Sequence, residues 1–410
     1  MIRRIEFENF MSLKNCRVDF EPLTIFIGPN ASGKSAIFKG LVTLSKLLSG
    51  APVRGPKGEF YLEDGVTLDD LVWGGNSGLS IKFRVWFLED TDDNNPGYSL
   101  ELAKRPEGWS VTHERIRTEN GWIYVDEDHP FEHQTERFGN KSLKPPMRAS
   151  LCYLVHPFAN DSAARPMIEP IISMGKRFGL TWRYRPSASD IASFVQRSAE
   201  TKTFFVQENG RGLALVLQEL QGSKRDVFLA IEKEVCRLFP HIKTIGFKSD
   251  RQGTRLAYMT NRSEDPIPAP QESDGVLLAT FTLWRLYTAG QFLKICLEEP
   301  EGGLHPYFLG DRYQLLKKFA YPEESRPSVQ ILVATHSRDF LRTLKTHPAT
   351  LFPELRIVDF DLYSGTSVKK LSHYREVHNL FEKYGNIGDL WSSGEMGGVP
   401  AGVQLELGQP

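Results

Sequence analysis

The sequence predicts an α/β fold: a mixed sheet with an antiparallel β meander, carrying a mainly helical insertion. Three observations predict it. Strand-like segments at the N-terminus run into a glycine-rich loop and then a helix. Residues 79–125 alternate apolar and polar side chains between turn-rich pieces, which is typical of antiparallel strands. Residues 276–360 alternate helices with strands, which indicates a largely parallel sheet.

Length, composition and charge narrow the class of protein. At 410 residues the chain exceeds what one hydrophobic core usually serves, so we expect two lobes or one fold with a large insertion. The 50 basic and 51 acidic residues give a net charge of -1, which by itself indicates neither a nucleic-acid nor a membrane partner. The four cysteines lie far apart without CxxC spacing, which argues against a zinc site or a disulfide framework. No apolar run approaches the ~20 residues that cross a bilayer, so we expect a cytoplasmic protein without a membrane partner.

The elements follow in order along the chain. Strands are expected at 2–10, 16–20 and 23–27, with a helix from Lys34, and meander strands at 79–88, 98–103, 109–116 and 121–125. Helical periodicity then appears at 190–197, 212–220 and 226–239, without a heptad repeat long enough for a coiled-coil arm. After strands at 243–247 and 254–258 we expect helices at 276–287, 307–319 and 338–344, alternating with strands at 292–297, 329–334 and 355–360.

The glycine-rich loop matches the pattern G-x-x-x-x-G-K-S in full, after an apolar strand and before a helix. Its glycines let the backbone aim successive N–H groups at phosphate oxygens, and the helix N-terminus favours the same anion. We expect Lys34 to reach the β- and γ-phosphates of ATP and Ser35 to ligate Mg²⁺. The predicted nucleotide-binding residues here are Gly28, Pro29, Asn30, Ala31, Ser32, Gly33, Lys34, Ser35 and Ala36.

A second motif is the apolar strand that ends in Glu298-Glu299-Pro300-Glu301. Hydrolysis of a phosphoanhydride needs a carboxylate near Mg²⁺ and another that orients or deprotonates the attacking water. We assign Glu298 to the metal and Glu299 to the water. Alone, an acidic strand end would be an ordinary solvated turn, and its pairing with a complete P-loop favours the functional interpretation.

Two further sites complete the set. His336 follows the strand at 329–334, where ligands of α/β sheets bind, and its imidazole could hydrogen-bond the γ-phosphate or the attacking water. Ser273-Asp274-Gly275 precedes the helix at 276–287 and places a serine at a helix N-terminus suited to an anion. The alternative interpretations are a structural histidine and plain helix capping.

In this order the segments resemble the AAA-21 and AAA-15 ABC-like ATPases, relatives of the overcoming-lysogenization-defect (OLD) proteins and of structural-maintenance-of-chromosomes (SMC) heads. The resemblance covers the ends of the chain and not its middle. It rests on Arg4-Ile5-Glu6-Phe7-Glu8-Asn9-Phe10 as the opening strand, the P-loop, Leu297-Glu298-Glu299-Pro300-Glu301 as the Walker B motif, Leu304-His305-Pro306 as the D-loop, Ala334-Thr335-His336-Ser337 as the switch histidine, and Ser273-Asp274-Gly275 as an abbreviated signature motif.

The resemblance implies an ATPase head whose two copies pair head to tail, so that the signature motif of one copy contacts the γ-phosphate held by the other. It divides the chain into residues 1–149, the first half of the head; 150–270, an inserted mainly helical lobe; 271–365, the second half of the head; and 366–410, a tail. Departures from the pattern are Glu298 in place of the usual aspartate, the lack of a full LSGGQ, and the lack of an identifiable Q-loop glutamine.

Many OLD relatives continue into a TOPRIM nuclease domain, on the order of 100 residues long. The stretch after the last predicted strand is about half of that size, and we interpret Asp359-Phe360-Asp361 as a strand end. The tail over 385–398 resembles the ending of stand-alone ATPases encoded beside a separate effector, as in the Septu and PARIS anti-phage systems. The resemblance therefore implies a sensor or motor whose nuclease or toxin-like effector is another polypeptide.

Three functions remain open from the sequence. The leading one is an ATPase switch in which ATP closes a homodimer and Glu299-directed hydrolysis reopens it. The second is an ATP-dependent assembly scaffold with little turnover. The third is an SMC-like DNA-repair clamp, which the near-neutral charge and the missing coiled coil disfavour, while DNA binding stays open. A GTPase would need an NKxD loop, whereas Asn140-Lys141-Ser142-Leu143 lacks the aspartate. Small-molecule kinases need neither a switch histidine nor a signature helix, and a transporter subunit would need the full signature motif and a membrane partner.

Overall fold

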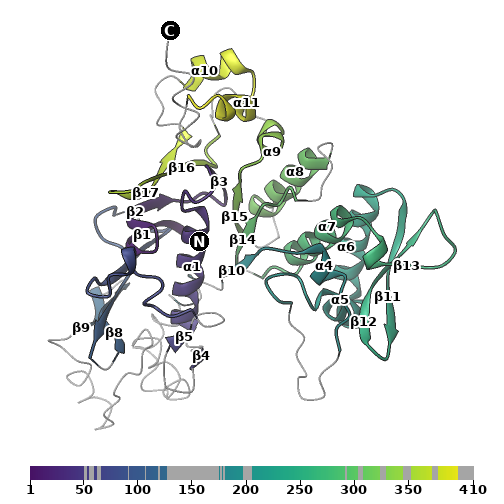
Figure 1. Cartoon of the computed structure of the whole chain (residues 1–410), viewed down its shortest axis with the longest axis horizontal. Coiled ribbons are helices and arrows are strands. Elements are labelled where there is room, and N and C mark those ends of the chain that lie inside the picture. Colours follow the sequence, from purple (N-terminus) through teal and green to yellow (C-terminus); the bar gives the residue numbers. More distant parts are fainter. Residues whose placement is uncertain are drawn as a thin grey trace. The chain divides into compact units, whose positions relative to one another are not determined.

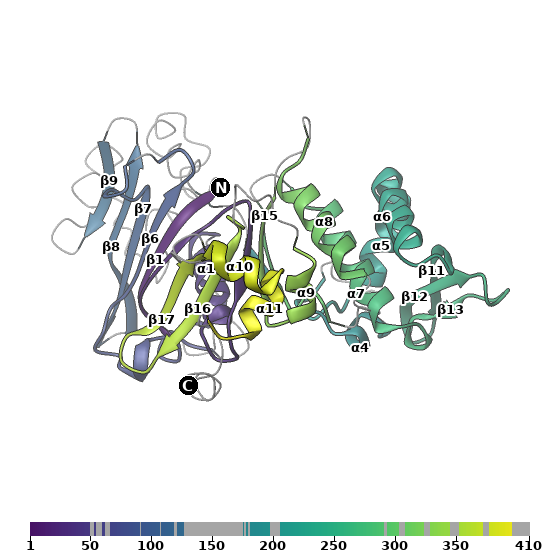
Figure 2. The same ribbon diagram turned by 90° about the horizontal axis from the view of Figure 1, so that it is seen from above.

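The structure is a computed structural model in which the chain divides into two compact units (Figures 1 and 2). Unit 1 comprises Met1–Thr181, His347–Lys383 and Leu390–Pro410, and unit 2 comprises Trp182–Thr346 and Tyr384–Asp389. The residues described are 1–49, 53–54, 60–61, 66–90, 92–106, 108–118, 121–126, 175, 178, 181–196, 206–290, 293–302, 308–323, 329–344, 352–371 and 377–395.

Unit 1 contains an antiparallel six-stranded sheet in the order β2-β1-β6-β7-β8-β9. Its strands are β1 (Ile2–Phe10), β2 (Leu13–Asp19), β6 (Ile81–Phe87), β7 (Tyr98–Arg105), β8 (Gly108–Thr118) and β9 (Gly121–Asp126). The last four strands are neighbours in chain order, so the predicted meander is confirmed.

A second set of strands in unit 1 has the order β3-β16-β17, formed by β3 (Leu23–Ile27), β16 (Leu355–Asp361) and β17 (Gly365–Lys370). The first pair is parallel and the second antiparallel, which confirms the predicted mixed sheet. Every residue of β3 is buried, as expected of a strand covered on both faces. Strand β17 lies beside β2 (Figure 1).

The other described elements of unit 1 are short, apart from one helix. Helix α1 (Lys34–Ser49) follows the glycine-rich loop and buries the apolar side chains of Ile37, Phe38 and Leu41. The short elements are β4 (Val53–Arg54), β5 (Phe60–Tyr61) and the 3-10 helix Trp73–Gly75. The boundary between the units in sequence falls within α10 (Val377–Tyr384) and α11 (Ile387–Ser392).

Unit 2 contains the strand order β10-β14-β15, formed by β10 (Thr181–Tyr184), β14 (Lys294–Glu298) and β15 (Gln330–Thr335). Strands β14 and β15 are parallel and every residue in them is buried. Helices α8 (Leu309–Ala320) and α9 (Arg338–Arg342) follow these two strands in sequence, and α8 packs against β15 (Figure 2). Short apolar runs that alternate with helices therefore form parallel strands, as predicted.

The rest of unit 2 packs helices on one face of a three-stranded antiparallel sheet (Figures 1 and 2). The strands are β11 (Ile242–Asp250), β12 (Gly253–Thr260) and β13 (Ile267–Pro268). The helices are α4 (Ala188–Ile191), α5 (Leu213–Ser223), α6 (Arg225–Leu238), α7 (Asp274–Tyr287) and the 3-10 helix Ala269–Gln271. The described part of the expected insertion at 150–270 therefore combines helices with a small sheet.

The helix predicted over 190–197 is wrong beyond Ile191, where α4 ends. Val195 instead forms an isolated antiparallel bridge, in which its N–H and C=O pair with the C=O and N–H of Thr254 at 2.9 Å each. Thr254 follows Gly253, whose φ of 123° few other residues adopt and whose added Cβ would meet the Val195 oxygen at 2.5 Å. A contact between segments distant in sequence overrides the local periodicity here.

The strand β17 was not predicted, because its sequence carries neither an apolar run nor a motif. The interpretation of Asp359-Phe360-Asp361 as a strand end agrees with the structure, since β16 ends at Asp361. The Asp361 carboxylate accepts the N–H groups of Tyr363 (2.9 Å) and Ser364 (2.8 Å), so it caps the turn of the β16–β17 hairpin. No helix in the described part of the chain is both long and apolar enough to span a bilayer.

A buried arginine joins the strands of unit 1. Arg356 on β16 is 1% exposed, and its guanidinium donates to the carbonyl oxygens of Asp19 (2.7 Å), Pro353 (2.5 Å) and Leu355 (3.0 Å). Burial lowers the pKa of Arg356, while nearby carboxylates led by Glu21 oppose the shift. The buried cation is therefore satisfied mainly by backbone carbonyls near the ends of strands.

We expect Arg356→Met to lower the free energy of unfolding by roughly 3 kcal/mol, because it leaves buried acceptors without a donor. The control is Arg17→Met, since Arg17 is half-exposed and its ion pair with Asp19 spans 3.9 Å, and it should cost about 0–1 kcal/mol. Urea denaturation of the full chain measures both. Equal losses in the two variants would contradict the role given to Arg356.

Candidate functional site

The glycine-rich loop of unit 1 lies between the buried strand β3 and helix α1, which begins at Lys34. Ala31 (φ 63°) and Gly33 (φ 106°) adopt left-handed backbone conformations. Turns of this handedness direct successive N–H groups into one concavity, which suits an anion. Lys34 Nζ donates to the carbonyl oxygens of Gly28 and Pro29, both at 2.7 Å, so the ammonium is held against the loop.

The loop packs tightly against β16 and β17, so the two glycines of the G-x-x-x-x-G-K-S pattern, Gly28 and Gly33, have no room for a side chain. A Cβ added to Gly28 would lie 2.2 Å from the Val358 oxygen, and one added to Gly33 would lie 2.1 Å from Thr366 Oγ1. Thr366 Oγ1 lies 3.0 Å from the Ser32 carbonyl oxygen and 2.8 Å from Ser12 Oγ. Thr366 therefore supports the loop from behind, a role that the sequence did not reveal because β17 carries no motif.

The loop has the features of a phosphate cradle. Ser32 is 1% exposed, and its hydroxyl has no hydrogen-bond partner among the described residues. A buried hydroxyl without a partner costs about 1–3 kcal/mol, which a phosphate oxygen would remove. Ser35, the second residue of α1, is exposed, and hydroxyl and carboxylate oxygens are the ligands that Mg²⁺ prefers. Loop backbone, lysine and serine thus fit the triphosphate of ATP.

In unit 2 the predicted carboxylates and the predicted histidine leave the same edge of a parallel strand pair. Glu298, the last residue of β14, pairs in register with Ala334 of β15. The Glu299 N–H donates to the Ala334 carbonyl at 2.9 Å, which extends the ladder by one bond. His336 Nδ1 then lies 3.8 Å from Glu299 Oε1. The structure therefore brings Glu298, Glu299 and His336 together.

Glu299 has a strained backbone, with φ at 49° in the left-handed region that favours glycine. A turn holds it there, because the Gly302 N–H donates to the Glu299 carbonyl at 2.9 Å. The side chain is 54% exposed, whereas Glu298 next to it is 9% exposed. Strain of this kind costs about 1–3 kcal/mol and persists where the surrounding structure imposes it, often at functional sites.

Glu298 is already paired with a cation that the sequence analysis did not identify. Arg183 on β10 donates from Nε to Glu298 Oε1 at 2.6 Å, and both side chains are nearly buried. Strand β10 neighbours β14 in the sheet, which explains the proximity. Because Arg183 bonds one oxygen of this carboxylate, a metal ion would have to bind the second oxygen. The assignment of Glu298 to Mg²⁺ stays a prediction.

Ser273 lies at the N-cap of α7 in an extended conformation, and its side chain makes no capping hydrogen bond. Its N–H is taken by the Glu272 carboxylate at 2.9 Å. Ser273 and Asp274 are exposed, whereas Gly275 is buried. The Ser273 side chain therefore does not cap α7, and the residue is exposed.

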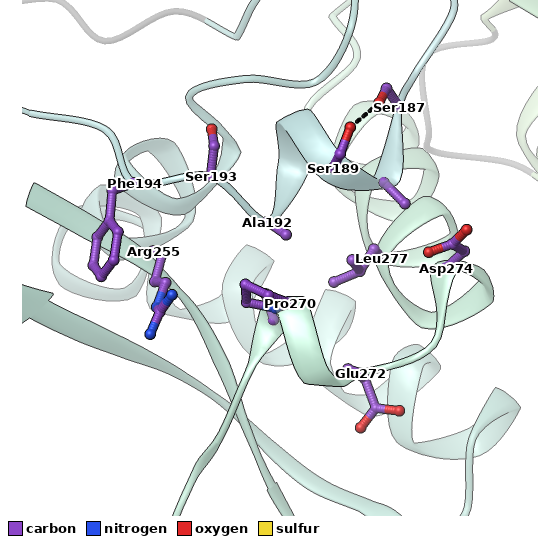
Figure 3. Close-up of a pocket in the computed structure, with 12 residues that line it drawn as sticks. Ser187, Ser189, Ala192, Ser193, Phe194, Arg255, Pro270, Glu272, Asp274 and Leu277 are labelled. Atoms are coloured by element: carbon purple, nitrogen blue, oxygen red, sulfur yellow. Dashed lines mark hydrogen bonds between the residues drawn. The ribbon is translucent and has the colours of Figure 1, made fainter.

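A pocket of about 530 Å³ in unit 2 adjoins this helix start (Figure 3). Glu272, Asp274 and Leu277 line one part of it, and the Arg255 guanidinium, 4.2 Å from the centre of the Phe194 ring, lines another. In the described part of the chain, no hydrogen bond or ion pair connects Ser273-Asp274-Gly275 with Glu299 or His336.

The predicted D-loop, Leu304-His305-Pro306, lies outside the described residues, as do residues 396–398 of the tail and Asn140-Lys141-Ser142-Leu143. No cluster of three or more His, Cys, Asp or Glu side chains that could hold a metal ion occurs in the described ranges. The predicted Mg²⁺ ligands, one hydroxyl and one carboxylate, are not such a cluster.

Comparison with protein families places ATPase domains in both halves of the chain. Residues 1–124, which contain the P-loop, match the AAA-15 family, described as "AAA ATPase domain". Residues 172–342, which contain Ser273, Glu299 and His336, match the AAA-21 family, described as "AAA domain, putative AbiEii toxin, Type IV TA system". The two matches confirm the resemblance to AAA-15 and AAA-21 over these two stretches of the chain.

Solved structures similar to the chain include two SMC heads. The SMC head domain from Thermotoga maritima has a TM-score of 0.36 at 12% identity, over 90% of this chain and 98% of that one. The Smc head domain from Pyrococcus furiosus, with an extended coiled coil and bound to the C-terminal domain of ScpA, has a TM-score of 0.44 at 11% identity, over 93% of this chain and 98% of that one. A search of curated proteins returned no match.

We expect Thr366→Val to weaken ATP binding roughly 3–10-fold, because it removes one hydrogen bond to the loop, worth about 0.5–1.5 kcal/mol, without changing the side-chain volume. Thr366→Ser should retain the bond, and Ser367→Ala, at the exposed neighbouring position, should change nothing. Titration with a fluorescent ATP analogue gives the Kd. Wild-type affinity in Thr366→Val would exclude a supporting role for this hydroxyl.

We expect Arg183→Met to lower the free energy of unfolding by about 3–5 kcal/mol, because it leaves the Glu298 carboxylate buried without its cation. The double variant Arg183→Met/Glu298→Gln should be more stable than Arg183→Met alone. Mg²⁺ and ATP together should recover part of the loss in the single variant only. Chemical denaturation measures all three, and a double variant no more stable than the single one would contradict the pairing.

Proposed function

We propose that the chain binds ATP and hydrolyses it, acting as a nucleotide-driven switch. The observation that supports this best is that two independent sets of residues suit the two halves of the reaction. The loop of unit 1 offers a phosphate cradle with Lys34, and the edge of unit 2 offers Glu299 next to His336 at 3.8 Å. The two matched ATPase-domain regions contain one set each.

In this proposal the loop backbone and Lys34 bind the β- and γ-phosphates. Lys34 would exchange its bonds to the Gly28 and Pro29 carbonyls for charge-assisted bonds to phosphate oxygens, which are roughly twice as strong as neutral ones. Ser35 and Glu298 would hold Mg²⁺, which neutralises charge on the phosphates when bound. The nucleotide-binding residues proposed are those of 28–36, as expected from the motif.

Glu299 is proposed to accept a proton from the attacking water. The oxygen of that water then bonds to the γ-phosphorus. The bond between that phosphorus and the bridging oxygen breaks, and ADP leaves with the electron pair as phosphate is released. His336 would hydrogen-bond the γ-phosphate and keep Glu299 oriented. The strained position of Glu299 suits a base that must reach a substrate, because its side chain is 54% exposed.

We further propose that two copies pair head to tail, with Ser273, Asp274 and Gly275 of each copy facing the nucleotide bound by the other. Ser273 supports this, because the residue is exposed at the start of a fourteen-residue helix, its side chain makes no capping hydrogen bond, and a helix N-terminus favours an anion. A homodimer would then form and dissolve with the nucleotide cycle.

The proposed biological setting is bacterial anti-phage defence. In it this chain is the sensor or motor, and a separate nuclease or toxin-like protein is the effector. Its support is the resemblance of the tail to stand-alone ATPases of that kind, together with the toxin and TA-system wording of the family matched by residues 172–342. DNA is a second candidate ligand for the dimer, as in an SMC-like clamp.

We expect Lys34→Ala to weaken ATP binding by about 30–100-fold, from the loss of charge-assisted bonds. Glu299→Gln should leave the ATP Kd nearly unchanged but lower kcat at least ~100-fold, the usual size of general-base catalysis. The matched controls are Lys39→Ala on the same helix and Glu264→Gln on an exposed loop. Nucleotide titration and phosphate release are the measurements.

Full turnover in both Lys34→Ala and Glu299→Gln would remove the proposed function. Glu299→Gln should also accumulate as an ATP-bound dimer, which light scattering reports as a doubled mass. If nucleotide changes the mass while Glu299→Gln keeps its biological activity, the chain is an assembly scaffold. Salt-dependent binding to duplex DNA would favour the clamp.

A further inference from the structure

Behind the Glu299–His336 edge lies a buried polar cluster that the proposed chemistry does not use. It consists of Glu301, Thr335, Arg312 and Thr282, which come from the turn after β14, the end of β15, and helices α8 and α7 of unit 2. Thr282, Thr335 and Arg312 are 1%, 0% and 4% exposed. Burying so many polar groups is costly unless each is paired, so the cluster needs an explanation.

One side of the cluster holds the turn that carries His336. Thr335 Oγ1 accepts the Ser337 N–H at 3.0 Å and donates to Glu301 Oε1 at 2.5 Å. Ser337 Oγ in turn accepts the Phe340 N–H at 3.1 Å and caps α9. The Thr335 hydroxyl therefore fixes the backbone on both sides of His336, and Glu301 fixes the hydroxyl.

The other side of the cluster connects the two helices. Arg312 Nη2 on α8 donates to Thr282 Oγ1 on α7 at 2.6 Å, and Thr282 Oγ1 donates to the Leu278 carbonyl at 2.9 Å. Helix α7 is the one whose N-terminus carries Ser273-Asp274-Gly275. Arg312 thus holds the proposed signature helix against the helix that follows β14.

The hydrogen bonding between the two sides of the cluster is incomplete. Glu301 Oε2 and Arg312 Nε are both buried, and neither has a hydrogen-bond partner in the part of the chain described. The two side chains attract electrostatically, yet no hydrogen bond joins Glu301 Oε2 to Arg312 Nε. Burial raises the pKa of Glu301 and lowers the pKa of Arg312 to about 10, since each charge is poorly solvated. Glu301 Oε2 is an acceptor without a donor, and Arg312 Nε is a donor without an acceptor.

We propose that Arg312 is a positioning residue that couples the signature helix α7 to the His336 turn through Glu301 and Thr335. A small shift of α7 and α8 would let Arg312 Nε and Glu301 Oε2 pair, and the Thr335 hydroxyl would carry the change to the backbone at Ser337. Nucleotide contact at the start of α7 and the orientation of His336 would then change together. The kinetic part of this inference rests on the proposed ATPase function.

The first test is kinetic and compares Arg312→Met, Glu301→Gln and their double variant with the control Lys318→Met, an exposed cation on the same helix. We expect Arg312→Met to lower kcat roughly tenfold with KM for ATP within about threefold, the size seen for coupling residues outside a site. The double variant should lose no more than the larger single loss, because both residues act through one contact. Multiplicative losses, or a kcat equal to that of Lys318→Met, would overturn the proposal.

The second test does not depend on turnover and follows hydrogen exchange of the amides of Ser337 and Phe340. Arg312→Met should speed their exchange, whereas Lys318→Met should not, because Arg312 interacts electrostatically with the Glu301 carboxylate that holds Thr335. Unchanged exchange overturns the proposal even when the ATPase is active. If wild-type protein does not hydrolyse ATP, the proposed function fails and this exchange result alone decides the inference.

If Arg312→Met fails to fold, Thr335→Val replaces it, since valine has nearly the same volume without the hydroxyl. It should speed exchange at Ser337 and lower kcat by a similar factor, and Thr335→Ser should rescue both. A variant that is less stable but keeps wild-type exchange at Ser337 and wild-type kcat would show that the cluster is structural only.

Discussion

The candidate nucleotide site depends on a tight backbone turn that only small residues permit. The loop before α1 takes left-handed conformations at Ala31 and Gly33, and the space behind Gly33 is filled by Thr366. The loop can therefore present its N–H groups to an anion only while β16 and β17 stay behind it. The C-terminal hairpin, more than three hundred residues away in sequence, is in this sense part of the nucleotide loop.

The edge of unit 2 obeys a second constraint, that of parallel strands. Because β14 and β15 are buried throughout, their register is fixed by apolar packing, and the residues that follow them must leave at the same edge. Glu299 and His336 are adjacent for this reason. The polar groups around them are each held by a partner from another element: Glu298 by Arg183, Thr335 by Glu301. The chemistry would take place on a rigid edge whose outermost carboxylate is strained.

Local patterns predicted the parts of this architecture that local physics determines. A buried run of apolar residues identified β3, β14 and β15, alternation identified the meander, and a spaced pair of glycines identified the loop. The sequence could not identify Thr366, Arg183 or Arg312, because their roles come from contacts with distant segments and no motif surrounds them. The failure at Val195 has the same origin, since its partner Thr254 lies in another element. Patterns therefore located the candidate site, and the residues that support it required the fold.

The most direct test of the central claim is the structure of Glu299→Gln with ATP and Mg²⁺ bound. We predict the triphosphate in the loop of residues 28–35, with the γ-phosphorus within reach of residue 299 through a single water molecule. Nucleotide bound elsewhere, or a γ-phosphate beyond the reach of one water from residue 299, would contradict it.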